Sequence, residues 1–337
     1  MAKRKYRKKM NKVQPAVTRL WFHIDPSNSI NYVDLSLAVS AANRRFYRQG
    51  LSWAVANMTL HTGSNTVGDF DVSKVPETWV AQNAYTKSKA LWMKSQNQVL
   101  VDQPTIKAKY RDFKVFLDQE MTTSTKQPVS NNPAANNTIM LPVDRNDQIA
   151  KTGEWIYSSL QLPVDGGSSE PDSTLLHFVG TDYTTTDAIS KGMIHGYGLS
   201  RNRPQDIDPN VPGDGGWMNE VFDVADNLGE IREDIEDENN VPPYRVGVAG
   251  EEEEYYPGGE NNQTDAQLHS VEFVSGTTVG GKTHISGGVF HCGLIRFDWN
   301  LSAPSTDVVT LEAIDSSMYL AVDLVPGNDK GYLTEAY

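Results

Sequence analysis

Cysteine is nearly absent from this sequence of 337 residues, in which Cys292 is the single example. A lone cysteine excludes a disulfide within the chain and a zinc site built from several cysteine thiolates. Long apolar runs are missing as well. No stretch reaches about 18 consecutive apolar residues, so we expect no membrane-spanning helix. No apolar segment follows the first residues, MAKRKYRKKMNK, and we therefore expect no secretory signal peptide.

Most motifs of catalysis and metal binding are missing too. The seven histidines form no H-E-x-x-H or H-x-H pair, and no G-x-S-x-G sequence occurs. The acidic residues fit no EF-hand loop. His291 and Cys292 are neighbours in a predicted strand, where adjacent side chains point to opposite faces and cannot act together as base and nucleophile. We therefore predict no catalytic residue, no metal and no cofactor.

One nucleotide-binding motif is complete. Gly276, four further residues, and then Gly281, Lys282 and Thr283 match G-x-x-x-x-G-K-[ST], the phosphate-binding loop of nucleotide hydrolases. That loop needs a helix directly after it, whereas the following residues, HISGGVFHCG, contain glycines that disfavour a helix. We interpret residues 275–288 as a loop between two antiparallel strands. The enzyme alternative predicts that Lys282→Ala abolishes nucleotide turnover.

Charge is unevenly distributed along the chain. The net charge is −13, yet seven basic residues and no acidic residue lie within the first twelve positions. Residues 214–260 instead hold 15 acidic residues against two arginines. A basic arm on an acidic body is typical of nucleic-acid binding, with a nuclear-localisation signal or a solubilising tail as alternatives. The predicted nucleic-acid-binding residues are Lys3, Arg4, Lys5, Arg7, Lys8, Lys9 and Lys12.

Hydrophobic periodicity predicts mainly β-structure. Alternating apolar residues indicate about eight strands, and no β-α-β-α alternation occurs, which favours an antiparallel sandwich with long loops. The predicted strands are 17–24, 51–62, 111–118, 153–162, 174–180, 268–275, 289–298 and 317–325. Residues 304–314 fit either a ninth strand or a short helix.

Helices are predicted in the connections. The clearest covers 77–99, where Val80, Ala84 and Leu91 belong to a stripe at spacings of three and four. Residues 30–47 alternate like a strand at first, but Asp34 as an N-cap favours a helix. Shorter helices are predicted within 184–199 and 216–238.

Three stretches carry a family resemblance: NRRFYRQG at 43–50, CGLIR at 292–296, and LVPG at 324–327 with KGY at 330–332. Together with the basic arm, they resemble capsid proteins of environmental, chiefly marine, small circular single-stranded DNA viruses. The similarity extends over roughly 16–335.

The resemblance implies an all-β, eight-stranded antiparallel jelly-roll sandwich whose sheets have the strand orders B-I-D-G and C-H-E-F. The eight predicted strands would be B to I in chain order. Residues 1–15 would be the arm and 16–337 the jelly-roll domain, with insertions at about 63–110 and 182–267.

The function implied is a structural capsid protein, not an enzyme, that assembles into an icosahedral shell and packages single-stranded DNA through the arm. Its partners would be copies of itself and the genomic DNA, with room for a host receptor and no membrane. It would reside in the virion after assembly inside the host cell. The acidic segment 214–260 would face outward or line an interface. The alternatives are a double-jelly-roll phage capsid protein and a non-viral carbohydrate-binding β-sandwich.

Overall fold

A computed structural model describes the chain in several stretches. They are residues 15–24, 29–63, 66–101, 112–124, 139–199 without 147, 149, 152, 154, 163–171 and 185–188, then 265–275, 281–304, 311–312 and 318–337. The basic residues of the arm and the acidic segment 214–260 lie outside these stretches, and so does the helix predicted at 216–238.

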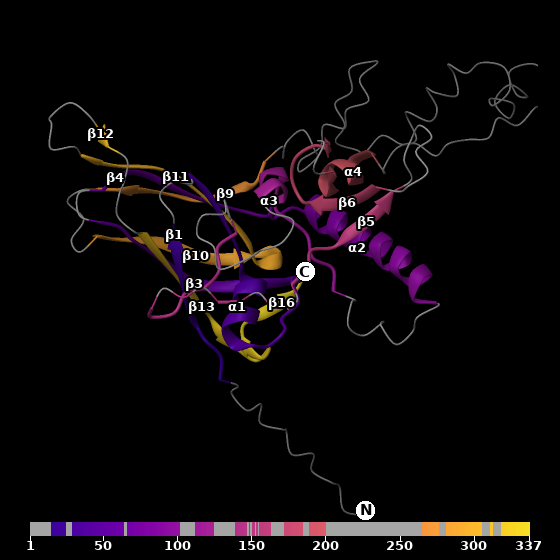
Figure 1. Cartoon of the computed structure of the whole chain (residues 1–337), viewed down its shortest axis with the longest axis horizontal. Helices are drawn as coiled ribbons and strands as arrows, with labels where there is room; N and C mark the ends of the chain where they lie inside the picture. Colours follow the sequence, from indigo (N-terminus) through magenta and orange to yellow (C-terminus); the bar gives the residue numbers. More distant parts are fainter. Residues whose placement is uncertain are drawn as a thin grey trace, which may run out of the picture.

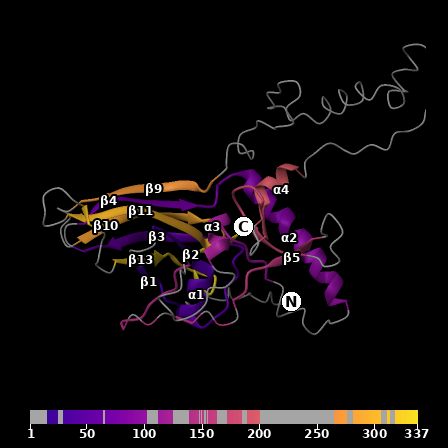
Figure 2. The ribbon, with the colours of Figure 1, turned by 45° about the horizontal axis from the view of Figure 1, so that its top comes forward.

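Two sheets, each with antiparallel pairing throughout, form a sandwich (Figures 1 and 2). In sheet A, β16 (Thr334–Ala336) pairs with the start of β3 (Leu51–His61). In sheet B, β2 (Ile30–Asp34) pairs with β11 (Leu294–Pro304). Sheet A has the order β1 (Arg19–Ile24), β13 (Met318–Leu324), β3 (Leu51–His61), β10 (Lys282–Phe290), with β16 at Thr334–Ala336. Sheet B has the order β12 (Leu311–Glu312), β11 (Leu294–Pro304), β4 (Val67–Lys74), β9 (Gln267–Val274), with β2 at Ile30–Asp34. The predicted all-β sandwich is confirmed at this level.

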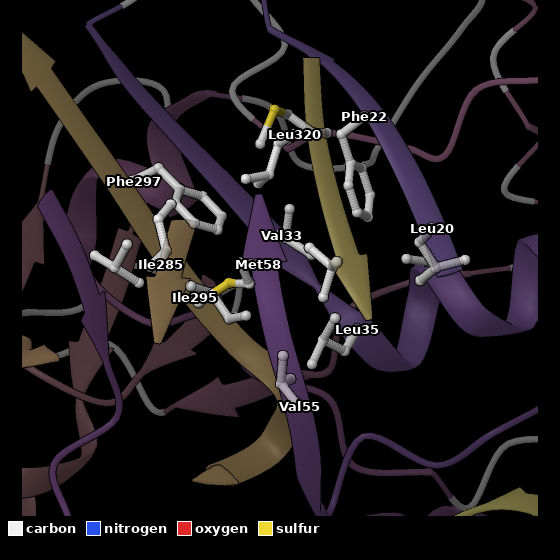
Figure 3. Close-up of a cluster of buried hydrophobic side chains, with 14 of the residues drawn as sticks. Leu20, Phe22, Val33, Leu35, Val55, Met58, Ile285, Ile295, Phe297 and Leu320 are labelled. Carbon is white, nitrogen blue, oxygen red and sulfur yellow. The ribbon is translucent and has the colours of Figure 1, made fainter. Parts of the chain in front are cut away.

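The core of the sandwich lies between the two sheets, as Figure 3 shows. Every second side chain of β1 points inward, so Leu20, Phe22 and Ile24 are buried while their neighbours are exposed. Phe297 of β11 and Met58 of β3 meet them from sheets B and A. Burial of apolar surface at about 25 cal/mol per Å² makes this two-sided core the main stabilising element of the sandwich.

The sandwich strands β2, β4 and β10 were not among the eight predicted strands, and one predicted strand was wrong in its extent. The segment 289–298 is the end of β10, a tight 3-10 turn at His291–Gly293, and the start of β11. The turn places Cys292 at φ 55° and Gly293 at φ 68°. A Cβ on Gly293 would lie 3.0 Å from both Leu35 and Trp53, so only glycine fits without displacement.

The ambiguous segment 30–47 contains both predicted structures in sequence. β2 ends at Asp34, and α1 (Leu35–Asn43) follows directly. Asp34 is the N-cap, as predicted, because its side chain accepts hydrogen bonds from the backbone amides of Ser36 and Leu37. The helix ends where Arg44 adopts the left-handed conformation.

A single long connection, residues 75–266, separates the paired strands β4 and β9. It takes the place of the two insertions expected at about 63–110 and 182–267. Its helices and labelled strands lie beside one end of the sandwich in both views of the ribbon (Figures 1 and 2), whereas residues 139–143 run along β1 and β2, where the Val143 amide donates to the Trp21 carbonyl at 2.8 Å. The connection contains α2 (Trp79–Leu100), α3 (Gln119–Ser124), β5 (Ser159–Leu162), β6 (Asp172–His177), β7 (Tyr183–Thr184), β8 (Ile189–Gly192) and α4 (Met193–Leu199).

Predictions within this connection had mixed outcomes. The helix at 77–99 is confirmed as α2, although Leu91 of the predicted stripe is exposed and Tyr85 and Trp92 are buried instead. The strand at 111–118 is wrong, since its described residues form only an isolated bridge at Phe116. The strands at 153–162 and 174–180 correspond to β5 and β6, which belong to a separate small sheet. That sheet packs with α2 on a second apolar core.

Candidate nucleic-acid interface at the root of the arm

The seven predicted binding residues, Lys3 to Lys12, lie outside the described residues. The structure describes the site where the arm joins the body, beginning at Pro15. Ala16 packs against the sandwich core, and Val17 is 42% exposed just before β1. This junction is the described part of the candidate interface.

Hydrogen bonds fix the junction. The Val17 amide donates to Asn43 Oδ1 at 2.9 Å, and the Tyr332 hydroxyl donates to the Val17 carbonyl at 2.6 Å. Asn43 Nδ2 in turn donates to the Tyr332 oxygen at 2.7 Å. The last residue of α1 and the strand β15 (Gly331–Tyr332) therefore hold the backbone at Val17 from two sides, and the arm leaves from a fixed point.

Basic side chains lie on the two segments that hold this junction. Arg44, Arg45 and Arg48 are exposed on the connection between α1 and β3. Lys330, in the hairpin between β14 (Pro326–Gly327) and β15, donates from Nζ to the Phe46 carbonyl at 3.0 Å. We call Arg44, Arg45, Arg48 and Lys330 the root patch. Positive charge next to the arm extends the electrostatic attraction for phosphates onto the folded body.

Buried aromatic rings support the root patch. The Tyr47 hydroxyl donates to the Lys330 carbonyl at 3.0 Å. Ring centroids of Tyr47, Trp53 and Tyr332 lie 5.5–5.9 Å apart, a spacing typical of favourable edge-to-face packing. Burial raises the pKa of Tyr332 to about 12, so its hydroxyl stays protonated and able to donate. These contacts hold the connection and the hairpin together as one rigid unit.

Phe46 is an exposed ring within the patch. It is 50% exposed, and its centroid lies 6.0 Å from that of Trp155. Lys114 lies beneath both rings, 5.5 Å from the Phe46 centroid and 4.9 Å from the Trp155 centroid, and pairs with Asp112 at 3.1 Å. An exposed ring among cations offers a stacking surface for an unpaired base.

The site unites two of the three stretches that carry the resemblance. NRRFYRQG at 43–50 and LVPG with KGY at 324–332 meet through the bonds of Tyr332 and Lys330. Neither composition nor periodicity could place them together, because Asn43 and Tyr332 are 289 residues apart. Sequence reasoning therefore missed the root patch, although a local excess of arginine at 44–48 was a visible signal.

The third stretch, CGLIR at 292–296, contributes to a different contact. Arg296 Nη1 donates to Asp118 at 2.9 Å and Nε donates to Asp298 at 2.8 Å. Asp118 also accepts from the Tyr32 hydroxyl at 2.9 Å. Because Asp118 belongs to the long connection and Arg296 and Tyr32 to the sandwich, this network fixes one to the other.

A second network of the same kind surrounds Asp34. Its carboxylate accepts from two amides of α1, from Gln49 Nε2 at 2.9 Å and from the Tyr157 hydroxyl at 3.2 Å. Gln49 also bonds both backbone groups of Val115. Burial raises the pKa of Asp34 to about 7, although the four donors oppose that shift. The carboxylate is fully enclosed, and it joins the sandwich to the connection.

The residues of the nucleotide-binding motif and the pair of His291 and Cys292 have structural roles. Lys282 and Thr283 of the nucleotide-binding motif lie in β10, which pairs with β3 from Lys282 onward, so no helix follows Thr283. Cys292 and His291 lie in the turn, so the prediction that they are neighbours in a strand was wrong. Cys292 is fully buried, and burial raises the pKa of its thiol. His291 packs on Tyr337 at 4.6 Å and bonds the Ser52 hydroxyl at 2.8 Å.

Among the described residues, no group of three or more histidine, cysteine or acidic side chains is placed to hold a metal ion. None of the helices described has both the length and the apolar character required of a membrane span. No protein-family model, curated protein or solved structure matches this chain.

Proposed function

We propose that this chain is a viral capsid protein of the small circular single-stranded DNA virus type, which assembles into an icosahedral shell and packages the genome through its basic arm. The observation that carries the proposal is the strand order of the sandwich, combined with an arm that leaves from a fixed basic junction. The protein would reside in the virion, with copies of itself and the genomic DNA as partners.

The strand order supports a jelly roll. Assigning B, C, D and E to β1, β2, β3 and β4, and F, G, H and I to β9, β10, β11 and β13, gives B-I-D-G in sheet A. Sheet B becomes C-H-E-F, with the short β12 added beside H. This assignment replaces the one made from the sequence, in which B and I correspond to the same strands and H overlaps the first half of β11. A jelly roll is an architecture common to viral capsid domains and lectins, so fold alone does not select the function.

An apolar edge supports self-association. β9 is the edge strand of sheet B in the described part of the chain. Its outward side chains Leu268, Val271 and Phe273 are 55%, 41% and 78% exposed. Exposed apolar residues on an unpaired edge favour contact with another chain. In a shell, that chain would be a second copy.

The root patch supports nucleic-acid packaging. Four cations on the folded body continue the charge of the seven on the arm. Each phosphate that these cations neutralise contributes about 0.7 to the slope of log affinity against log salt on a single strand. The lectin alternative gives no account of this concentration of positive charge.

Electron microscopy of the purified recombinant chain tests the assembly. We expect uniform spherical shells. For packaging, a variant with Lys3, Arg4, Lys5, Arg7, Lys8, Lys9 and Lys12 replaced by glutamine keeps the length of the arm and removes its charge. Its shells should form but contain less nucleic acid, measured by the ratio of absorbance at 260 and 280 nm. Absence of shells would refute the capsid function, and unchanged nucleic-acid content would refute the role of the arm.

A further inference from the structure

The first strand, β1, follows the arm in the sequence and contributes side chains to the outer face of sheet A. In β1, Arg19, Trp21 and His23 are exposed and point away from the core, whereas the residues between them are buried. Strand alternation places these three side chains on one face, following Val17 at the junction. The arm therefore leads directly onto this face.

The register of sheet A extends this line into rows. Across the sheet from His23 lie Tyr319, His61 and Lys282, in that order. His23 and Tyr319 have ring centroids 5.3 Å apart. One row thus brings together two imidazoles, a phenol ring and an ammonium group.

The next row is centred on a tryptophan. Across from Trp21 lie Ala321, Thr59 and His284. Trp21 is 36% exposed, and its ring centroid lies 5.1 Å from that of His61 in the row above. Ala321 and Thr59, in the middle of this row, are themselves buried, so the groups exposed along it are those of Trp21 and His284.

The third row contains the carboxylate of Asp323, which is paired. Arg19 Nη2 donates to Asp323 Oδ2 at 2.7 Å, and Asn57 and Ser286 complete the row. Burial lowers the pKa of His61, and the nearby charges of Lys282, Arg19 and His284 lower it further. Glu335 of β16, the register partner of Ser52, is a second exposed carboxylate on sheet A. Around Trp21 and His61, the face thus carries cationic, imidazole and aromatic groups.

The opposite side of the sandwich has the reverse character. On the outer face of sheet B, Asp69 and Asp71 point away from the core because Phe70 and Val72 are buried. Asp298 is the register partner of Asp71. Burial raises the pKa of Asp71, and the nearby carboxylates of Asp69 and Asp298 raise it further. Asp298 is paired with Arg296, so Asp69 and Asp71 are the carboxylates that make this side less favourable for a nucleic acid than the outer face of sheet A.

We propose that the outer face of sheet A is a second binding surface for single-stranded nucleic acid, which holds the strand after the arm has captured it. The proposal rests on the capsid function and deepens it, since it assigns sheet A to the inner side of the shell. Phosphates contact Arg19, Lys282 and the histidines, and unpaired bases stack on Trp21 and Tyr319. Exposed rings on a sheet favour single strands because the bases of a duplex are not free to stack on them.

Binding of a fluorescent 20-nucleotide oligo-dT to the full-length, unassembled chain tests this surface. Trp21→Ala should weaken binding about tenfold, the lower range of a lost base stack, and Trp21→Phe should restore most of it. Lys282→Glu should reduce the slope of log affinity against log salt by about 1. Matched controls are Trp79→Ala, which removes a tryptophan 42% exposed on α2, and Lys94→Glu on the same helix.

The outcomes separate this inference from the capsid function. Affinities of the Trp21 and Lys282 variants equal to those of the controls would overturn the surface, even if shells form. A loss confined to these variants would support it, even if shells do not form. Binding of a glycan array in place of oligo-dT would also overturn it. Ultraviolet crosslinking of packaged nucleic acid in purified shells should label the peptide containing Trp21, and labelling confined to sheet B would contradict the assignment.

Discussion

At the scale of single residues, Tyr332 has the largest structural role at the arm junction. Its buried hydroxyl donates to Val17 and accepts from Asn43, so it joins the C-terminal hairpin, the end of α1 and the start of β1. These three segments come from opposite ends of the sequence. One phenol group thus determines where the arm begins.

Tyr332→Phe should lower the free energy of unfolding by about 1–2 kcal/mol, because it removes two hydrogen bonds and leaves the partner groups at Val17 and Asn43 unsatisfied. Urea denaturation measures the loss. Limited trypsin digestion should also cleave faster at Arg19, since the junction is released. A variant with wild-type stability and wild-type cleavage would contradict the role given to this hydroxyl.

His177 makes stability depend on pH. It is fully buried and burial lowers its pKa to about 4, against an ordinary value of about 6.5 in the unfolded chain. Above pH 6.5 both states are neutral and the contribution is complete. As pH falls from 6.5 towards 4, only the unfolded chain takes up the proton, so stability is lost.

Asp34 has the opposite pH dependence, because its pKa of about 7 makes stability fall as pH rises from about 4 to 7.

Urea midpoints at pH 7, 5.5 and 4.5 separate the two groups. His177→Gln should remove the loss of stability at acid pH, so its midpoint should fall less than that of the wild type between pH 7 and 4.5. Asp34→Asn should remove the loss of stability that accompanies rising pH, so its midpoint should fall more than that of the wild type between pH 7 and 4.5. The same pH profile in His177→Gln and wild type would show that this imidazole is not the responsible group.

At the scale of elements, the sequence patterns identified β1, β3, β9, β13 and α2, because each has a clear period and few interruptions. β4 was missed because Gly68 and two aspartates weaken its β-propensity. β10 was missed because Gly287 and Gly288 break the alternation. A Cβ on Gly287 would lie 2.3 Å from the carbonyl oxygens of Val55 and Ala56, so glycine permits β3 and β10 to approach there.

Under the proposed capsid function, β9 is the element on which assembly most depends. Phe273→Asp should reduce shell formation strongly, because it places a charge at the most exposed apolar position of the edge, while stability should change by less than about 0.5 kcal/mol. Sedimentation velocity and electron microscopy measure the shells. Val101→Asp is the matched control, since Val101 is 77% exposed at the end of α2. Normal shells from Phe273→Asp would exclude β9 from the contacts between subunits.

At the scale of the whole molecule, eight strands were predicted, whereas the two sheets of the sandwich have five strands each, and several of the predicted strands lie outside them. Segments 111–118, 153–162 and 174–180 lie in the long connection, whereas β2, β4 and β10 of the sandwich lay in segments assigned to helix or loop. Local periodicity cannot reveal which strands pair across hundreds of residues. The root patch and the face of sheet A were hidden for the same reason, since their members come from both ends of the chain.

Cys292 gives the molecule a practical property. The thiol is enclosed at the turn between β10 and β11, and its raised pKa leaves almost no thiolate at neutral pH. Maleimide reagents should therefore not react with the Cys292 thiol in the folded protein. A cysteine introduced at an exposed position such as Lys94 would be labelled alone, so each subunit could carry one fluorophore or gold cluster without first removing the natural cysteine.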